Sequence, residues 1–491
     1  MRSGRSAAVV PRPVSAVVAG EPFALDGSTQ VSAGQAEAAV AEYLVHALRA
    51  STGLPLTVTP EPAAAGAISL HLDGDIDLGA EGYRLDVTRA GVRLRAREPA
   101  GLFRGVQTLR QLLPAAVEHD TVQPGPWQVP GVRVVDRPRF AWRGAMLDVA
   151  RHFFTVDDVK RFIDLAVLYK INVLHLHLTD DQGWRIAIDG WPELTRIGAS
   201  TEVGGGRGGF YTKADYKDIV DYAGARYVAV VPEIDVPGHT NAALASYPQL
   251  NCDGRAPQPF TGTRVGFSAL CLDRPSTYEF VADVFDEVVA ITPGQFLHVG
   301  GDEARTVPDH EYAAFATRIQ KIVASTGKTA VGWQEVAAGT LEAGSVVQYW
   351  NIDEAPARLL EAVRTGAQVL LSPADRTYLD MKYDARTAVG NDWAGCVEVR
   401  DAYEWDPATT IEGVNEADVI GVEAALWTET VADIGAVEFM TYPRLSAIAE
   451  VAWSPEKRRT WKDFRLRLAA QAPRWEAMAV AFHRSPQIPW P

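Results

Sequence analysis

The stretch "INVLHLHL", residues 171 to 178, is an apolar run of strand length with little polar interruption. Such runs are typical of strands that are buried on both faces of a sheet. Seven more follow the same pattern: "GAMLDVA" (144–150), "YVAVVPEID" (227–235), "FLHVGG" (296–301), "TAVGW" (329–333), "SVVQYW" (345–350), "AQVLLS" (367–372) and "VIGVEAALW" (419–427). Most neighbouring runs leave room for a helix between them. Eight buried strands that alternate with helices predict an α/β fold, a parallel (β/α)8 TIM barrel.

The first part of the chain follows a different pattern. Helical spacing in "QAEAAVAEYLVHALRA" (35–50) and "GLFRGVQTLRQLL" (101–113) flanks the alternating, strand-like "GYRLDVTRAGVRLRA" (82–96). We therefore expect a small N-terminal α+β domain over residues 1–133, without a cluster of catalytic residue types. The barrel would occupy residues 134–491, and the proline-rich residues 124–140 indicate a linker or a boundary between the two.

Composition narrows the possible partners. The chain has 491 residues, 47% hydrophobic and 22% charged, with a formal net charge of −15. That charge gives no basic footprint for nucleic acid and argues against binding to anionic membranes. No run of 18 apolar residues predicts a membrane span. The start, "MRSGRSAAVVPRP", shows no apolar signal-peptide core, so we expect either a cytoplasmic protein or a secreted one that lacks its export signal.

Three cysteines, Cys252, Cys271 and Cys396, form no C-x-x-C pair, so a structural zinc site is not expected. Cys252 and Cys271 flank one loop-like stretch. They could close a disulfide, which would imply an oxidising compartment, or they could remain free thiols.

Polar and aromatic residues follow nearly every predicted strand. Catalytic groups of TIM barrels lie at the carboxyl ends of the strands, so this common placement predicts one site. The residues are Asp148 and Arg151, His177 and Asp180, Glu233 and Asp235, Asp302 and Glu303, Trp333, Trp350, Tyr378 and Asp380, and Trp427 and Glu429. Tryptophan faces suit the C–H surfaces of a sugar, and carboxylates with an arginine suit its hydroxyls. The mixture favours a carbohydrate over a phosphate compound.

Seven motifs in order resemble the β-N-acetylhexosaminidases of glycoside hydrolase family 20. They are "GAMLDVARHFF", "HLHLTDDQGWR", "VPEIDVPGHTNA", "HVGGDEA", "GWQE", "YLDMKY" and "ALWTE". The resemblance covers the whole barrel, and the N-terminal part is similar to the small non-catalytic domain of that family. It implies an exo-acting, retaining enzyme that removes terminal β-linked N-acetylhexosamine from oligosaccharides or glycoconjugates, with no cofactor and no metal.

The resemblance also implies a role for each matching residue. Glu303 would be the general acid and later the base, Asp302 would hold the acetamido N–H, and Tyr378 would donate to the acetamido oxygen. Trp333, Trp350 and Trp427 would wall the pocket, and Arg151, Asp380, Trp393 and Glu429 would contact sugar hydroxyls. Asp180 and His239 would support the two carboxylates, His239 through Asp302.

Adjacent carboxylates in "GGDE" fit a substrate-assisted mechanism. In such enzymes the substrate's own acetamido oxygen attacks the anomeric carbon and forms an oxazolinium ion, so that a second carboxylate nucleophile is not needed. Asp302 would stabilise the positive charge that develops on the acetamido nitrogen. Its charge, together with a hydrophobic wall, is expected to raise the pKa of Glu303.

Two other classes stay open at this point. His175, His177, His239, His298 and Asp302 could indicate a metal-dependent amidohydrolase, although the first strand offers no ligand and no strand end carries a bridging lysine. A non-catalytic sugar-binding barrel would keep the tryptophans but would not need Glu303. In the hexosaminidase interpretation, His175 and His298 are core histidines. The sequence leaves the preferred epimer, GlcNAc or GalNAc, the natural substrate and the oligomeric state open.

Overall fold

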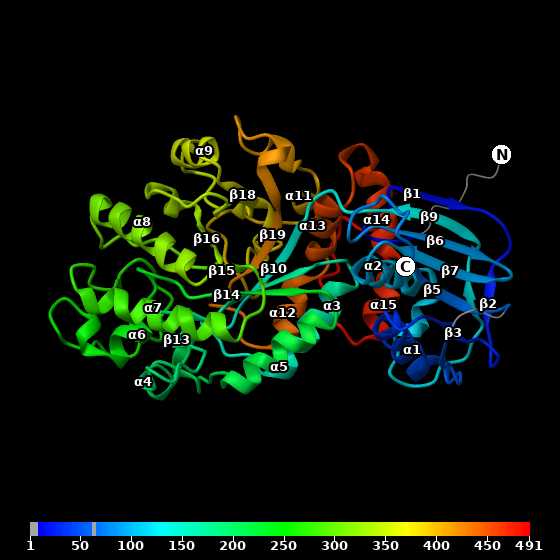
Figure 1. Cartoon of the computed structure of the whole chain (residues 1–491), viewed down its shortest axis with the longest axis horizontal. Coiled ribbons are helices and arrows are strands. Elements are labelled where there is room, and N and C mark those ends of the chain that lie inside the picture. Colours follow the sequence, from blue (N-terminus) through cyan, green and yellow to red (C-terminus); the bar gives the residue numbers. More distant parts are fainter. Residues whose placement is uncertain (1–7, 61–64) are drawn as a thin grey trace.

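The computed structural model describes residues 8–60 and 65–491. Residues 1–7, on which part of the signal-peptide expectation rests, lie outside the described residues. Two domains lie side by side, the barrel at the left of Figure 1 and the N-terminal domain at the right. In the described part of the chain, no helix is both long and apolar enough to cross a membrane.

Eight parallel strands close into a barrel, in the order in which they occur along the chain. They are β10 (Trp142–Asp148), β11 (Val173–His177), β14 (Ala229–Glu233), β15 (Phe296–His298), β16 (Thr329–Trp333), β17 (Val346–Tyr349), β18 (Gln368–Leu371) and β19 (Val419–Leu426). Each lies within or at the edge of one of the eight predicted runs, so the barrel prediction is confirmed. Glu233 pairs in register with His177 on one side and His298 on the other, which brings three strand ends together.

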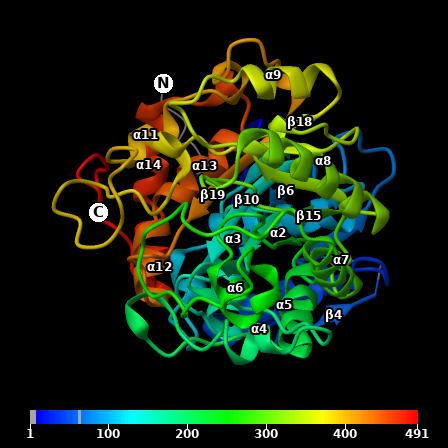
Figure 2. The same cartoon turned by 90° about the vertical axis from the view of Figure 1, so that its left-hand side faces the viewer.

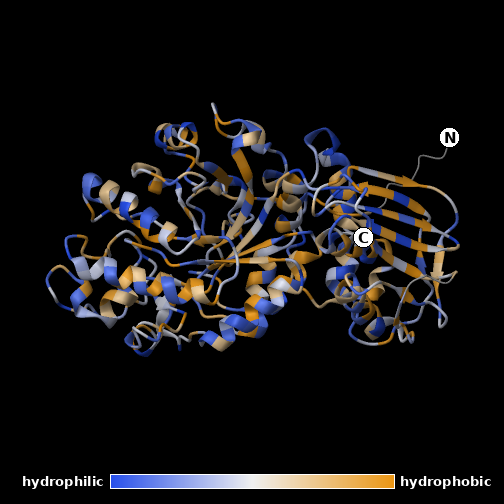
Figure 3. Ribbon diagram, viewed as in Figure 1, coloured by the Kyte–Doolittle hydropathy of each residue, from blue (hydrophilic) through white to orange (hydrophobic). Residues whose placement is uncertain are grey.

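Helices follow most of the strands and surround the barrel (Figures 1 and 2). Two of them, α3 (Val156–Val167) and α5 (Lys213–Gly224), begin at capping boxes in which Thr155 and Thr212 bind the third backbone N–H. Others are α6 (Asn241–Ser246), α7 (Pro275–Ala290), α8 (Asp309–Ser325), α9 (Ala357–Arg364), α12 (Ile434–Thr441) and α13 (Arg444–Trp453). Between β16 and β17 a 3-10 helix, η4 (Gln334–Ala338), replaces the α-helix. Hydrophobic and hydrophilic residues alternate along the surrounding helices, as expected for elements with one buried face (Figure 3).

The N-terminal domain is a seven-stranded sheet covered by α1 (Ala38–Thr52) and α2 (Pro99–Leu112). The sheet order is β1 (Ser15–Val18), β9 (Val132–Asp136), β6 (Tyr83–Thr88), β7 (Gly91–Ala96), β5 (Ile68–Leu72), β3 (Val31–Ser32) and β4 (Val58–Thr59).

Of the two interpretations of residues 124–140, a linker or a boundary, the linker was wrong. β8 (Trp127–Val129) pairs with β2 (Phe23–Leu25), and β9 pairs with both β1 and β6. Val132 and Val134 alternate inward along β9, and this pattern outweighs the prolines that flank it. The sheet therefore continues to Asp136, past residue 133.

Asp136 ties the two domains together. Its fully buried carboxylate accepts hydrogen bonds from Tyr83 (2.7 Å), from the Lys170 ammonium (3.1 Å) and from the Trp453 indole (3.0 Å). Tyr83 belongs to the sheet, whereas Lys170 and Trp453 belong to the barrel. Removal of Lys170 would leave the Asp136 charge buried without its ion-pair partner, so this junction is expected to be sensitive to substitution.

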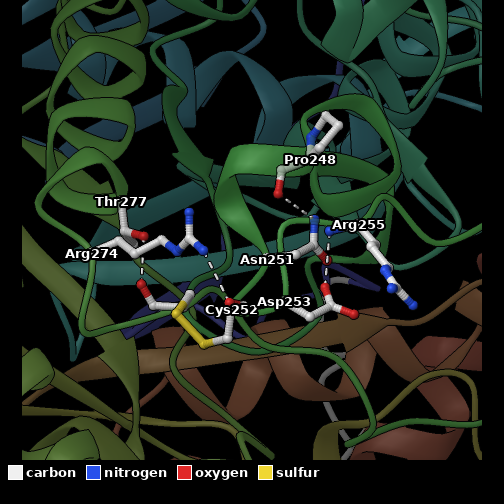
Figure 4. The surroundings of a disulfide bond; sticks show 8 residues. Pro248, Asn251, Cys252, Asp253, Arg255, Arg274 and Thr277 are labelled. Carbon is white, nitrogen blue, oxygen red and sulfur yellow. Dashed lines mark hydrogen bonds between the residues drawn. A yellow bond between two sulfur atoms is a disulfide. The ribbon is translucent and has the colours of Figure 1, made fainter.

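Cys252 and Cys271 form a disulfide (Figure 4). Arg274 donates to the carbonyl of Cys252 (3.0 Å), and Thr277 donates to that of Cys271 (2.6 Å). The bond closes the loop that carries Thr263 and Val265. Cys396 is a free, exposed thiol.

Candidate active site

A cavity of about 540 Å³ lies at the carboxyl ends of the barrel strands, within the size range of small-molecule sites. Ten of the residues predicted from the sequence line it: Arg151, His239, Asp302, Glu303, Trp350, Tyr378, Asp380, Trp393, Trp427 and Glu429. Asp180 and Trp333 lie behind this lining, in contact with Arg151 and Trp427 respectively. The structure thus brings the predicted residues together, while the role of each stays a prediction.

Two glycines bend the chain after β15. Gly300 has a φ of +64°, and a Cβ there would lie 1.8 Å from a carboxylate oxygen of Asp235. The next amide, that of Gly301, donates to the same oxygen (3.0 Å). Glu303 itself has a φ of +48°, a left-handed conformation that L-residues rarely adopt. This bend allows two consecutive side chains, Asp302 and Glu303, to line one cavity.

His239 lies between the two carboxylates and a third one. Its Nε2 is 3.5 Å from Asp302 Oδ2 and 3.6 Å from Glu303 Oε2, and its Nδ1 is 3.1 Å from Asp180 Oδ1. The prediction that His239 acts through Asp302 therefore covers one of these three contacts. Burial alone would lower the pKa of His239, but Asp180 and Asp302 raise it well above its usual value. His239 is therefore positively charged and lies next to both carboxylates, Asp302 and Glu303.

Asp180 is held ionised by the groups around it. Its Oδ2 is 2.8 Å from the Arg151 guanidinium and 2.8 Å from His177 Nε2. Burial acts to raise its pKa, but Arg151 and His239 lower it well below its usual range. Arg151 also reaches Asp148 (3.1 Å) and lies 4.8 Å above the Trp427 ring. Asp180 thus fixes the positions of one cavity arginine and one cavity histidine.

Beneath the cavity, the carboxylate of Glu233 is surrounded by several rings. His177 Nδ1 (2.5 Å), His298 Nδ1 (3.0 Å) and the Trp333 indole (2.9 Å) all face its carboxylate. His175 and His298 are buried, as the core interpretation predicts.

Some of these residues are spaced as metal ligands are, for example His177 with Glu233 and Asp235, or His239 with Asp302 and Glu303. Both ring nitrogens of His177 already face carboxylates, one of Glu233 and one of Asp180. This geometry matches a network of ion pairs that supports the cavity from below.

The expected rise of the Glu303 pKa was wrong. Burial and the neighbouring charge raise the pKa of Asp302 to about 6, whereas the pKa of Glu303 is lowered. Burial alone would raise it, but hydrogen bonding and charge from His239, with the Arg305 and Arg151 guanidinia, outweigh burial. Arg305 is in direct contact with the Glu303 carboxylate. In the free protein, Asp302 therefore takes up a proton at a higher pH than Glu303 does.

Four aromatic rings form a cage beside Asp302. The Trp350 and Tyr378 rings are nearly parallel, 16° apart with centroids 6.3 Å apart, and Trp393 stands edge-on to both. Trp427 closes the cage 6.3 Å from Tyr378. Tyr378 and Trp427 are buried, whereas Trp393 is 56% exposed and marks the entrance. Such a cage fits a small apolar group next to a flat ring.

Several buried carboxylate oxygens in this cavity have no hydrogen-bond partner among the described residues. They belong to Asp302 (Oδ1), Asp380 (Oδ1) and Glu429 (Oε2). Burial, followed by the charge of Glu429, raises the pKa of Asp380 to about 8. Buried polar atoms are normally paired, so these oxygens identify positions where hydroxyl or amide donors of a ligand would bind.

Some of the lining residues could not be predicted from the sequence. These are Thr263, Val265, Arg305, Asn351, Asp353, Asn391 and Thr430. Asn351, Asp353 and Thr430 come shortly after the ends of β17 and β19, whereas Thr263, Val265 and Asn391 lie in loops farther from the strand ends. Arg305 follows "HVGGDEA" and shows its role only through its contact with Glu303.

Comparisons with known proteins match both domains. The family described as "Glycosyl hydrolase family 20, catalytic domain" matches residues 140–312 and 307–456, and "Glycosyl hydrolase family 20, domain 2" matches residues 6–137. The chain belongs to glycosyl hydrolase family 20. Among its relatives in the family, the β-N-acetylhexosaminidase of Cellulomonas fimi is 48% identical over 99% of this chain and 97% of its own length.

Solved structures of family 20 agree with this assignment. The β-N-acetylhexosaminidase of Streptomyces coelicolor A3(2) superimposes with a TM-score of 0.96 at 53% identity, covering 99% of both chains. A mutant β-hexosaminidase of Streptomyces plicatus in complex with its product, GlcNAc, superimposes with a TM-score of 0.97 at 54% identity, covering 100% of this chain and 99% of that one. Family membership decides against both the amidohydrolase and the non-catalytic alternatives.

Proposed function

We propose that this enzyme hydrolyses terminal, non-reducing N-acetyl-β-D-hexosamine residues of oligosaccharides or glycoconjugates, with retention of configuration. One observation carries the proposal: Asp302 and Glu303 lie together at one side of a cavity whose aromatic cage adjoins Asp302. Together with His239, their oxygens lie within 4.8 Å of one another. In a substrate-assisted mechanism the acetamido oxygen displaces the leaving group and water then displaces that oxygen, so retention needs no second carboxylate nucleophile.

In the first step the substrate supplies the nucleophile. Its acetamido oxygen attacks C1, the bond from C1 to the leaving-group oxygen breaks, and Glu303 gives its proton to that oxygen. Asp302 accepts the acetamido N–H and stabilises the positive charge that develops on the nitrogen of the oxazolinium ring. Tyr378 donates to the acetamido oxygen, and the cage excludes water from the acetyl methyl group.

In the second step Glu303 acts as the base. A water molecule loses its proton to Glu303 and attacks C1 on the face that the leaving group has vacated. The bond from C1 to the acetamido oxygen breaks, and the acetamido group is restored. Two displacements at C1 give net retention.

Paired p-nitrophenyl glycosides test the proposed function. We expect hydrolysis of the β-GlcNAc glycoside, and the rate on the β-GalNAc glycoside gives the preference at O4. The matched β-glucoside lacks the acetamido nucleophile and should be cleaved far more slowly. Comparable rates on the β-glucoside and the β-GlcNAc glycoside would contradict the proposal.

Trp427→Ala should raise the KM for β-GlcNAc substrates. Trp427 is 8% exposed and packs between the Arg151 guanidinium and the Trp333 ring. Stacked aromatic contacts contribute about 0.5–1.5 kcal/mol beyond area burial, which corresponds to a two- to twelvefold change in KM. Trp427→Phe keeps a ring, so its KM should lie between those of Trp427→Ala and wild type. Thermal unfolding shows whether each variant is folded. Unchanged kinetics in a folded Trp427→Ala variant would mean that this ring serves only the core.

The pH profile of kcat/KM should be bell-shaped with its maximum below about pH 6. Catalysis needs one proton on the pair, placed on Glu303. Because the pKa of Asp302 is about 6 and that of Glu303 is lowered, the pair loses its last proton as the pH rises through about 6. Activity should therefore fall above that pH. A plateau of kcat/KM that extends to pH 8 would contradict this protonation state.

A further inference from the structure

Arg305 lies beside the proposed acid and is held there by a loop. Its guanidinium contacts the Glu303 carboxylate, and its side chain is 64% exposed. Its aliphatic part passes over Gly266, where an added Cβ would come 2.8 Å from Arg305 Cδ. The proposed mechanism gives Arg305 no task, and an arginine at this position opposes the acid role because it lowers the pKa of Glu303.

A second cavity of about 290 Å³ adjoins the first at Glu303. The two cavities share Glu303, Arg305, Trp350 and Asn351, whereas Tyr378, Asp380, Trp427 and Glu429 are found among the described lining of the first cavity alone. Glu303 must contact the oxygen that joins the sugar to its leaving group. A leaving group next to Glu303 therefore has the second cavity and Arg305 within reach.

The charges of the second cavity change when Glu303 is protonated. Its other charged residues are Arg305, Arg358, Asp309 and Glu335, with Asp309 3.7 Å from Arg358. Glu335 accepts a hydrogen bond from the Trp350 indole (3.1 Å), and burial with the charge of Asp302 raises its pKa to about 8. When Glu303 and Glu335 are both neutral, the guanidinia of Arg305 and Arg358 face one ionised carboxylate in this cavity, that of Asp309. Arg305 has then lost Glu303 as its counter-ion. Two further acids lie near this end: Asp353, which lines the first cavity, and Glu354, which accepts a hydrogen bond from Gln334 (3.1 Å).

We propose that Arg305 binds a carboxylate on the leaving group, so that the enzyme favours N-acetylhexosaminides whose aglycone carries an acidic group close to the glycosidic oxygen. Guanidinium and carboxylate form strong, bidentate hydrogen bonds. Protonated Glu303 no longer neutralises Arg305, and the carboxylate of the leaving group takes its place as the counter-ion. The carboxylate takes no part in bond making, and the C1–O cleavage is unchanged. This inference rests on the proposed function.

Two β-GlcNAc glycosides test it, one of 3-hydroxybenzoate and one of 3-hydroxybenzamide. Their leaving groups match in shape and differ in charge. We expect wild type to have the higher kcat/KM on the carboxylate, and Arg305→Gln to lower the carboxylate-to-amide ratio about two- to fivefold, the range for an exposed ion pair. Added salt should lower the wild-type ratio as well. Arg264→Gln removes the same charge from the loop that carries Gly266. The Arg264 guanidinium lies 4.6 Å from the centre of the Phe267 ring, and its loss should leave the ratio unchanged.

The amide substrate provides a second readout. Glu303 faces His239, Asp302, Arg151 and Arg305, so the loss of Arg305 alone should raise the Glu303 pKa and shift the alkaline limb of the amide profile to higher pH. A wild-type preference for the amide, or an unchanged ratio in Arg305→Gln, would overturn the inference and leave the proposed function standing. Failure to cleave either glycoside would instead overturn the proposed function.

Discussion

Glu303→Gln is expected to lower kcat on unactivated N-acetylhexosaminides by about 10²–10⁴-fold, the usual contribution of general acid–base catalysis. Glutamine keeps the shape of the side chain beside His239, but it has no acidic proton to give to the leaving-group oxygen. Affinity for GlcNAc should change little, because the cage and the hydroxyl-binding carboxylates are untouched. Steady-state kinetics on chitobiose, with GlcNAc inhibition measured beside it, check both expectations.

The leaving group distinguishes acid catalysis from a structural effect of the same substitution. An aryl group of low pKa needs little protonation, so its departure should be slowed far less than that of a sugar. Azide needs no general base and should restore turnover of such an activated glycoside by attacking C1 in the second step. Equal losses on the activated and unactivated substrates, without rescue by azide, would contradict the acid–base role of Glu303.

Asp302→Asn should lower kcat by about 10²–10³-fold, the loss typical of removing one preorganised group that stabilises transition-state charge. The amide can still accept the acetamido N–H, but it carries no negative charge to oppose the positive nitrogen of the oxazolinium. The variant also lacks the carboxyl whose pKa is raised to about 6, so the alkaline limb of the pH profile should change.

Binding of a thiazoline analogue of the bicyclic intermediate tests the same role of Asp302. Wild type should bind it far more tightly than free GlcNAc, because transition-state-like ligands are favoured selectively. Asp302→Asn should lose much of that selectivity while its affinity for GlcNAc is nearly preserved. A glycosyl-enzyme adduct on Asp302, trapped with a 2-fluoro sugar and seen by intact mass, would instead make Asp302 a nucleophile.

The barrel could be predicted from the sequence because its strands are buried on both faces. Continuous apolar runs such as 171–178 and 367–372 have few alternative structures at that length. Residues 124–140 were misassigned because prolines outweighed the alternation of Val132 and Val134, whose partner strands are remote in the chain.

Positions in the site could also be predicted, but its electrostatics could not. Strand ends meet at one face of a barrel, so Asp302, Tyr378 and Trp427 are brought together by topology alone. The pKa of Glu303 depends on the contact with Arg305 and on the imidazolium of His239, and both follow from loop conformations that only the folded chain defines. Thr263 and Val265 reach the cavity because of a disulfide-closed loop, whose path the sequence does not specify.

Substrate assistance can be tested on the wild-type enzyme with aryl β-glucosaminides whose N-acetyl group carries no, one, two or three fluorine atoms. Fluorine withdraws electrons from the acetamido oxygen and makes it a poorer nucleophile, while the leaving group and the hydroxyl contacts stay the same. Substrate assistance predicts that log(kcat/KM) falls steeply with each added fluorine. A flat series would contradict it, because an enzyme carboxylate that attacks C1 is indifferent to the nucleophilicity of that oxygen.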